Sequence, residues 1–529
     1  MQAKLFFKNA VILIAGSFFM RALGVAFGAY LSGKMGAEGM GLFQLTATVY
    51  GLASTFATSG IYLSVTRLVA EELAAGSYAG ADDAMRKCMR YGLIVSLLAA
   101  VGLFCLAEPI GTVLLGDART VLSLKILALA LPFMAFSSSL RGYFFALRMA
   151  GKSSGGQIVE QLAHMAVAIG LFPAVVPEGD LTLACAAAAG GCLGGELISF
   201  LFSLILYLRD RRKWSFVKTS SRDITRRMVR ITLPVALSSY LKSILRTIEN
   251  LLVPRGLRKY GASGSGALAQ YGMTEAMVMP ILTFPTAFLT SFSSLLVPEI
   301  AEAQAVGDNA RISRLVSKVV RYTLLFAAAM TGIFVFFAEE LGWAVYRQEG
   351  VGSMLGLLAP LVPLMYLDNV ADSMLKGMDE QVSVLRYSIC DSAVSICLLW
   401  FLLPIYGVNG YIFVMFASTF LNATLSFARL ASVTCIRIHL VQWIVKPVLC
   451  VSGACLCANV LLNFTALSAG WDAVARIGAA LGLYFLFLCA TGTFTREDFR
   501  WFYRVFHPDK PESPHPAKSS PASRSKSGQ

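Results

Sequence analysis

Two arginines lie deep inside apolar stretches of this chain, at Arg21 and Arg246. An arginine at the centre of a bilayer costs about 2.5–3.5 kcal/mol even on the lenient insertion scale, so it needs a partner or a function. Its permanent charge and planar fork of donors suit recognition of an anion such as a pyrophosphate. Each arginine could instead satisfy a helix carbonyl or a neighbouring acid. The sequence repeat that relates the two positions favours binding of an anionic substrate.

Other basic residues accompany these two arginines. Lys242, Arg246 and Glu249 are spaced i, i+4 and i+7, which places them on one helical face. Lys242 would deepen an anion site and Glu249 would orient Arg246, or the three charges would simply neutralise one another. Arg67 lies at the inner end of an apolar stretch, where anchoring at the membrane surface is the ordinary role of an arginine. We keep Arg67 as a weaker candidate for substrate binding.

A second group of charged residues is acidic. Asp368, Asp372 and Lys376 lie on one helical face, and Asp391 lies in the next apolar stretch. Together with Glu249, these carboxylates predict a site that couples transport to Na⁺ or H⁺. A structural ion pair between Asp372 and Lys376 near the inner mouth is an equally good interpretation. The eleven cysteines are scattered without a C-x-x-C pair, so neither a metal site nor a cofactor is predicted.

These residues belong to a chain that repeats itself. Residues 69–76 return as residues 300–307, at an offset of 231 positions. Near the start of each copy, residues 34–41 match residues 259–266 at an offset of 225, and this register aligns the two arginines. The growth of the offset predicts six additional residues in the second copy. A duplicated membrane unit is typical of two-lobed transporters.

Two local matches predict where the copies differ. Residues 140–142 match residues 375–377 at an offset of 235, which predicts that the second copy has gained about one turn bearing acids. A short apolar match further along aligns Asp391 with His164. We therefore expect ion coupling to reside in the second copy.

Composition places the repeat in a membrane. Hydrophobic residues make up 56% of the chain and charged residues 14%. Fourteen successive apolar runs reach spanning length, which excludes a soluble globular protein. The runs lie near 9–33, 41–66, 91–115, 121–146, 157–177, 181–208, 231–253, 267–298, 322–345, 354–376, 387–404, 410–430, 443–467 and 475–495.

The repeat and the runs predict an all-α polytopic membrane protein of about fourteen transmembrane helices. Two pseudo-symmetric six-helix lobes would be related as parallel repeats, with two further helices at the C-terminal side. The predicted parts are an N-terminal lobe at 1–208, a basic cytoplasmic linker at 209–230, a C-terminal lobe at 231–430, the extra helices at 443–495 and a disordered cytoplasmic tail at 506–529.

The distribution of Lys and Arg predicts that both termini are cytoplasmic, because basic residues concentrate on the segments that this orientation places inside. One predicted outer loop is an exception to this distribution, because it contains Arg255, Arg258 and Lys259. The net charge of +14 is explained by this topology and by anionic lipid headgroups. It does not indicate a nucleic-acid partner.

Three motifs, at 17–24, 36–43 and 64–71, resemble those of the stage V sporulation protein B branch of the multidrug/oligosaccharidyl-lipid/polysaccharide exporter superfamily. That superfamily includes flippases for lipid II and for polysaccharide units. The resemblance covers roughly residues 1–500 and implies two lobes in a V with alternating access. It further implies outward movement of an undecaprenyl-pyrophosphate-linked sugar.

The same resemblance implies that Arg21 and Arg246 match cavity arginines of the lipid II flippases. Those proteins often carry an Arg-Asp pair six and seven positions after the first arginine, where this chain has Phe27 and Gly28. The expected protein is thus a monomeric flippase of the bacterial plasma membrane, with membrane lipids around it and a polyprenyl-linked glycan as substrate.

Two other functions stay open on the sequence. A cation-coupled multidrug antiporter of the same superfamily would favour acidic cavity residues and typically twelve spans. A membrane enzyme that polymerises glycans would need a catalytic motif, and no H-E-x-x-H, G-x-S-x-G or P-loop pattern occurs in the sequence. We therefore predict that the chain is not an enzyme.

Overall fold

The computed structural model describes residues 2–177, 179–211, 223–434, 436, 440–462, 469–498 and 500, and all regular elements within these residues are helices. Nine helices of this described part are long and apolar enough to cross a membrane. The prediction of an all-helical polytopic membrane protein is confirmed, while the count of fourteen spans stays a prediction. Residues 212–222 of the predicted linker and the predicted tail at 506–529 lie outside the described residues.

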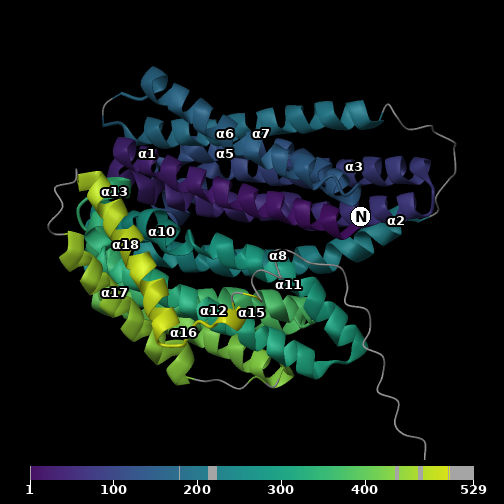
Figure 1. Cartoon of the computed structure of the whole chain (residues 1–529). Coiled ribbons are helices and arrows are strands. Elements are labelled where there is room, and N and C mark those ends of the chain that lie inside the picture. The colour runs from purple at the N-terminus through teal and green to yellow at the C-terminus, as the bar shows by residue number, and fades with distance from the viewer. Residues whose placement is uncertain are drawn as a thin grey trace, which may run out of the picture.

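Most of the first part of the chain is arranged in long helices (Figure 1). Its elements are α1 (Gln2–Thr58), α2 (Ile61–Ala74), α3 (Tyr78–Cys105), α4 (Ala107–Pro109), the π-helix η1 (Ile110–Leu114), α5 (Thr120–Ala146), α6 (Ala150–Val175) and α7 (Leu181–Arg211). Helix α1 changes direction at Gly36, whose φ of 64° and ψ of −174° lie outside the helical region. A glycine adopts this conformation at little steric cost.

The second part follows the same plan with more interruptions. Its elements are α8 (Ile224–Tyr260), α9 (Gly264–Tyr271), the π-helix η2 (Gly272–Val278), α10 (Met279–Thr283), α11 (Thr286–Val306), α12 (Asn309–Phe336), α13 (Ala338–Tyr346), α14 (Val351–Leu358), η3 (Ala359–Leu361), α15 (Val362–Gly377), α16 (Gln381–Thr434), η4 (Val441–Val445), α17 (Lys446–Leu462) and α18 (Ala469–Ala490). Figure 1 shows the purple and blue helices α1–α7 on one side and the green and yellow helices after α8 on the other.

The backbone repeats along with the sequence. Helices α3 and α12 each have 28 residues and begin 231 positions apart. Positive φ is uncommon outside glycine, and eight of the fourteen residues with positive φ in the described part recur at the two offsets that the sequence motifs show. The pairs are Gly36 with Gly261, Gly76 with Gly307, Gly116 with Arg347, and Arg148 with Asp379.

The helix bounds correct two of the alignments expected from short motifs. Helix α5 has 27 residues, as does the segment formed by α14, η3 and α15, so the second copy has gained no turn there. Arg141 therefore corresponds to Asp372. Since α6 and α16 also begin 231 positions apart, Asp391 corresponds to Glu160 and not to His164. The motif matches were wrong because a shift of four residues preserves a helical face.

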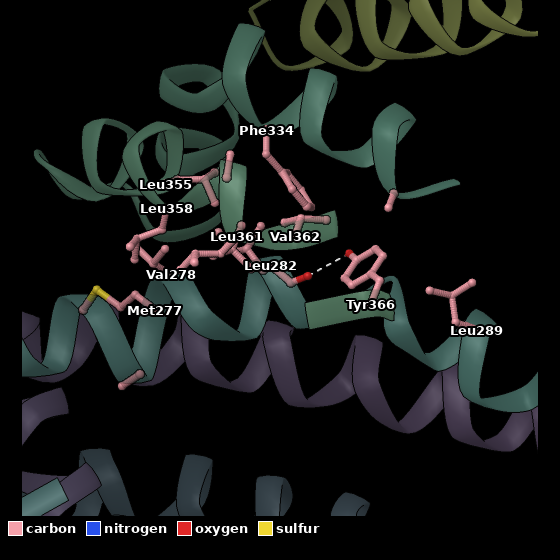
Figure 2. Packing of buried hydrophobic residues seen from close by; sticks show 14 of the residues in the cluster. Met277, Val278, Leu282, Leu289, Phe334, Leu355, Leu358, Leu361, Val362 and Tyr366 are labelled. Atoms are coloured by element: carbon pink, nitrogen blue, oxygen red, sulfur yellow. Dashed lines mark hydrogen bonds between the residues drawn. The ribbon is translucent and has the colours of Figure 1, made fainter. Parts of the chain in front are cut away.

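A large buried core reaches across both parts of the chain. Figure 2 shows part of it, where Leu282 of α10 packs among apolar side chains from α12, α14 and α15. The Tyr366 hydroxyl donates a hydrogen bond of 2.8 Å to the Leu282 carbonyl. This contact fixes the short helix α10 just before the chain breaks at Phe284 and Pro285.

The two parts of the chain meet closely at the end that the predicted topology places outside. A Cβ atom added to Gly41 would lie 2.0 Å from the Leu268 carbonyl oxygen, and one added to Gly272 would lie 2.4 Å from the Ala37 oxygen. Only glycine permits backbones to approach this closely. The contact joins α1 to α9 and η2 and closes the molecule at this end.

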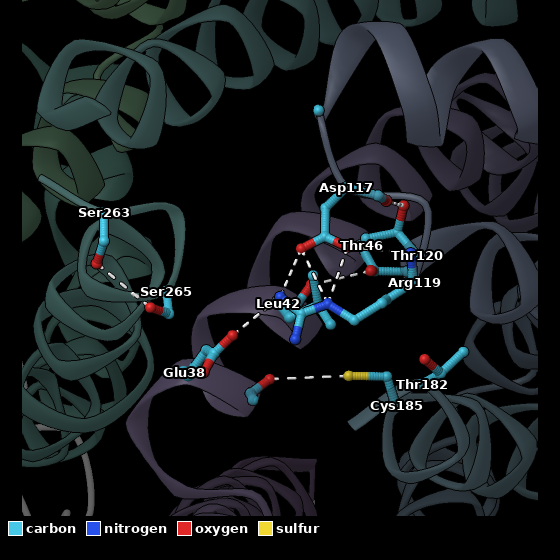
Figure 3. A network of polar contacts seen from close by, with 12 residues as sticks. Glu38, Leu42, Thr46, Asp117, Arg119, Thr120, Thr182, Cys185, Ser263 and Ser265 are labelled. Carbon is cyan, nitrogen blue, oxygen red and sulfur yellow. Dashed lines mark hydrogen bonds and ion pairs between the residues drawn. The ribbon is translucent and has the colours of Figure 1, made fainter. Parts of the chain in front are cut away.

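Polar contacts lie at the same end of the molecule (Figure 3). Arg119 pairs with Asp117 at 2.6 Å and reaches Glu38 of α1 at 2.9 Å. From the end of α8, the Arg255 guanidinium donates to the carbonyls of Val113 and Leu114. Arg255 belongs to the basic segment that opposed the predicted topology. It lies at the end of α8, and its partners are backbone carbonyls of η1.

Candidate functional site

A polar cavity of about 590 Å³ lies between the second half of α1 and helix α8. Its cationic groups are Lys242 and Arg246. The remaining lining consists of hydroxyl, amide and small residues: Gln44, Ala47, Thr48, Gly51, Leu52, Ser54, Thr55, Thr58, Ser59, Ser239, Ser243, Thr247 and Asn250. Many hydroxyl donors beside two positive charges suit an anion that also carries polar groups. We call this space the cationic cavity.

The face of α8 that the sequence predicted places both cations in the cationic cavity. Arg246 is exposed and Lys242 is half-buried. Within the described part of the chain, the Arg246 guanidinium has no carboxylate at ion-pair distance. Glu249, one turn further on, lies close enough to Ser392 of α16 to interact with its hydroxyl. The arrangement leaves the charge of Arg246 available to a ligand, and its role in substrate binding stays a prediction.

Arg21 does not line the cationic cavity. Its guanidinium donates to the Thr283 carbonyl and, at 2.7 Å, to Thr286 Oγ1. The Thr283 carbonyl is exposed by the break after α10, because the Ala287 amide, its usual helical partner, bonds Phe284 instead. A helix carbonyl was one of the two partners that the sequence left open for Arg21.

Arg21 and Arg246 nevertheless occupy equivalent backbone positions in the two copies of the repeat. Arg21 precedes Gly36 by the same number of residues as Arg246 precedes Gly261, and both glycines have positive φ. Arg21 thus occupies the matching helix position, and it joins α1 to the second part of the chain. In this conformation the structure brings Lys242 and Arg246 together but gives Arg21 a separate environment.

Arg67 lies on the surface of α2, with its side chain 63% exposed. It forms an ion pair of 2.8 Å with Glu71, which also pairs with Arg227 at 2.5 Å. Hydrogen bonds first from Arg67 and then from Arg227 lower the pKa of the Glu71 carboxyl. Arg67 is therefore engaged on its own helix, and any contact with substrate stays a prediction.

Three of the predicted acids lie together between α15 and α16. Asp368 accepts a hydrogen bond of 2.9 Å from Asn422, Asp372 accepts one of 3.3 Å from Ser426, and Asp391 accepts one of 2.8 Å from Ser418. Asp368 Oδ1 is buried and has no hydrogen-bond partner within the described residues.

The acids adjoin the cationic cavity. Asp372 interacts electrostatically with Lys242, and Asp391 interacts with Glu249. Asp372 also pairs with Lys376 at 3.6 Å, as the structural interpretation of the sequence expected. Among the residues that the structure describes, no three acids, histidines or cysteines form a group that could hold a metal ion.

Two features of this region escaped the sequence reasoning. The hydroxyl residues of α1 were missed, although Thr48, Thr55 and Thr58 recur at the spacing of one helical face. The ion pair of 2.8 Å between Arg141 and Glu160 was also missed. The spacing of these two residues gave no signal, because they come from different helices, α5 and α6.

A cationic, hydroxyl-lined cavity within a bundle of membrane-spanning helices defines the class of this protein as a membrane transporter. The chain belongs to the polysaccharide biosynthesis protein family, whose family model matches residues 6–304.

The chain is similar to several known proteins. It is 24% identical over 451 residues to stage V sporulation protein B of Bacillus subtilis (strain 168), covering 84% of this chain and 87% of that protein. A structure of the lipid II flippase MurJ in an inward closed conformation matches with a TM-score of 0.68 at 13% identity, covering 93% of this chain and all of that one. An inward-facing multidrug resistance MATE family transporter matches with a TM-score of 0.59 at 15% identity, over 80% of this chain and 96% of that one.

These comparisons confirm the resemblance to the sporulation protein branch of the exporter superfamily. The matching solved structures are a flippase and a transporter. Together with the family match and the relatives, they confirm the prediction that the chain is not an enzyme. The fold is shared by lipid flippases and multidrug transporters. The substrate must therefore be inferred from the site.

Proposed function

We propose that this protein moves an undecaprenyl-pyrophosphate-linked cell-wall sugar precursor from the inner to the outer leaflet by alternating access. The observation that carries the proposal is the cationic cavity, where Lys242 and Arg246 lie among hydroxyl groups. Positive groups bind a pyrophosphate strongly once water is partly excluded. The substrate named for the MurJ relative, lipid II, belongs to the same chemical class.

The membrane potential would assist such transport. A lipid-linked pyrophosphate carries up to about two negative charges. If both cross the whole field, an inside-negative potential of about 100 mV favours export by roughly 4–5 kcal/mol. The cations of α8 would shield these charges during the crossing, when the bilayer would otherwise exclude them.

The finer architecture is part of the proposal. We infer fourteen spans, arranged as two pseudo-symmetric six-helix lobes and two additional helices, in a monomer whose termini are both cytoplasmic. Helix α16 has 54 residues and bends at Gly407, which suits two crossings in place of one. In this scheme Arg21 would leave the Thr283 carbonyl and turn to the substrate as the lobes rearrange.

Coupling to Na⁺ or H⁺ is proposed at Asp368, Asp372, Asp391 and Glu249. The repeat supports it, because the first copy has an arginine where the second has Asp372. Arg141 neutralises Glu160 in the first copy, whereas the corresponding Asp372 and Asp391 are both acidic. Lys376 pairs with Asp372 at 3.6 Å, whereas Asp368 and Asp391 have no ion pair among the described residues. A bound cation would supply positive charge to these two acids.

The multidrug antiporter is the less favoured function. A multidrug transporter has a fold similar to that of this chain, and the acids between α15 and α16 would suit a cation. The lining of the cationic cavity argues against it, because Lys242 and Arg246 repel cationic drugs.

Reconstitution in liposomes tests the proposed function. Full-length protein is assayed with fluorescent lipid II and with other polyprenyl-linked glycans, and with a cationic dye as competitor. Arg246→Ala and Lys242→Ala should each slow flipping at least about tenfold, the effect of one lost charged contact. Arg230→Ala, which removes an exposed arginine of the same helix outside the cavity, is the matched control. Normal flipping by a folded Arg21→Ala, Arg246→Ala double variant would overturn the proposal.

A further inference from the structure

A second polar pocket lies in the first part of the chain, among α2, α5 and α6. Its volume is about 320 Å³. Two aromatic rings, those of Tyr62 and Phe145, stand at its side with their centroids 5.9 Å apart. The polar groups facing them are those of Ser138, Arg141, Ser153, Ser154 and Gln157. We call this space the aromatic pocket.

The charge balance of the aromatic pocket differs from that of the cationic cavity. Arg141 is paired with Glu160 at 2.8 Å, and the side chains are only 14% and 29% exposed. Glu196 lies close enough to interact with both and is 4% exposed. One arginine therefore faces two carboxylates. This balance disfavours a phosphate and leaves hydroxyl and amide groups as the available hydrogen-bonding partners.

The two spaces adjoin at the junction of α1 and α2. Ser59 lines the cationic cavity, and Tyr62 of the aromatic pocket follows it by three residues. The two residues lie on either side of Gly60, where the chain turns between α1 and α2 with a φ of 77°. A single elongated ligand can therefore contact both.

We propose that the aromatic pocket binds an uncharged sugar ring of the lipid-linked substrate while Lys242 and Arg246 bind its pyrophosphate. This inference rests on the proposed function and adds a glycan subsite to it. The rings of Tyr62 and Phe145 would cover the apolar face of a pyranose, since aromatic side chains combine a large apolar surface with a defined orientation. Serine hydroxyls and the Gln157 amide would pair with sugar hydroxyl or acetamido groups. A site with such partners discriminates strongly against a ligand that lacks them.

The test compares two ligands that differ only in the sugar. Full-length protein in nanodiscs is titrated with undecaprenyl pyrophosphate and with undecaprenyl-pyrophosphate-linked N-acetylglucosamine. The wild type should bind the sugar-bearing lipid about tenfold or more tightly than the bare lipid. Tyr62→Ala and Gln157→Leu should each reduce that preference about three- to tenfold, as expected for one lost contact, while affinity for the bare lipid stays unchanged. Tyr62→Phe, which keeps the ring, should retain most of the preference.

Controls separate this inference from the proposed function. Gln381→Leu makes the same chemical change at an exposed glutamine of α16 outside both spaces, and should leave both affinities unchanged. Arg246→Ala should weaken both lipids equally. If Tyr62→Ala and Gln157→Leu keep the full preference for the sugar, the glycan subsite is wrong and the flippase proposal stands. If the wild type binds neither lipid, both proposals fail.

Discussion

Arg141 and Asp372 occupy the same place in the two copies of the repeat. Each lies five residues before the end of a 27-residue helical segment, and the two segments begin 231 positions apart. Arg141 is neutralised by Glu160, whereas Asp372 lies with Asp368 and Asp391 among hydroxyl and amide donors. A duplicated scaffold thus carries opposite charges at one position, which gives the two halves different chemistry.

The acidic group predicts how transport depends on cations. Removing the charge in Asp391→Asn and Glu249→Gln should abolish any acceleration of flipping by a Na⁺ or H⁺ gradient, because no carboxylate would gain or lose a cation there. Flipping in liposomes with and without each gradient measures this. Asp83→Asn, which alters an ion pair with Lys87 away from these acids, is the control. An unchanged gradient dependence in the double variant would remove these acids from coupling.

The glycine contact between α1 and η2 predicts a steric effect. Gly41→Ala would place a methyl group 2.0 Å from the Leu268 carbonyl oxygen, so the backbones must separate at a cost of about 1–3 kcal/mol. The melting temperature should fall, and a cysteine introduced near Ser263 should react faster with a membrane-impermeant maleimide. Gly33→Ala, where a Cβ meets nothing within 4 Å, should change neither. Equal behaviour of the two variants would contradict the close contact.

A third prediction concerns the start of α8. Arg227 pairs with Glu71 at 2.5 Å and with the buried Glu72 at 2.6 Å, both on α2. Arg227→Ala should destabilise the protein by about 1–3 kcal/mol, because the buried Glu72 carboxylate loses a charged partner. Thermal unfolding in detergent measures the loss. The neighbouring Arg226→Ala, on the exposed side, should stay within about 0.5 kcal/mol of the wild type.

The loop between η1 and α5, which contains Asp117, predicts that the stability of the protein depends on pH. Burial acts to raise the pKa of the Asp117 carboxyl, but hydrogen bonds and the charge of Arg119 outweigh it and lower the pKa. A lowered carboxyl pKa stabilises the closed loop above the usual value of about 3.9, and this stability is lost as pH falls through the lowered value. The melting temperature in detergent should therefore fall as the pH is lowered through the pKa of Asp117. The Asp117→Asn variant should melt lower already at pH 7 and lose less on acidification; an acid dependence equal to that of the wild type would dismiss the contact.

The sequence predicted the helical membrane fold because long apolar runs admit few other structures in a bilayer. It predicted the face of Lys242 and Arg246 because helical spacing is local. It did not predict the partner of Arg21, since the Thr283 carbonyl becomes available only where α10 ends. Contacts between distant segments depend on backbone breaks, which a pattern of residue types does not locate.

The alignment of the copies shows the same limit. Matching of short motifs set Asp391 against His164, while the helix bounds set it against Glu160. Apolar motifs such as Ala-Val-x-Ile recur on many helices, so they fix a face but not a register. Positive-φ residues fix the register, because a turn can occupy only one place in the chain.

The matching bounds of the two copies have a practical consequence for building new proteins from this one. From Gly76 to Ala150 and from Gly307 to Gln381, the longer helices begin and end 231 positions apart. The turns differ before α5 and α14, where Arg119 has a φ of −61° and Gly350 a φ of 82°. Either stretch is a segment of the same length, and hybrids that carry one segment twice would exchange Arg141 for Asp372. They would separate what the duplicated backbone contributes from what its diverged side chains have added.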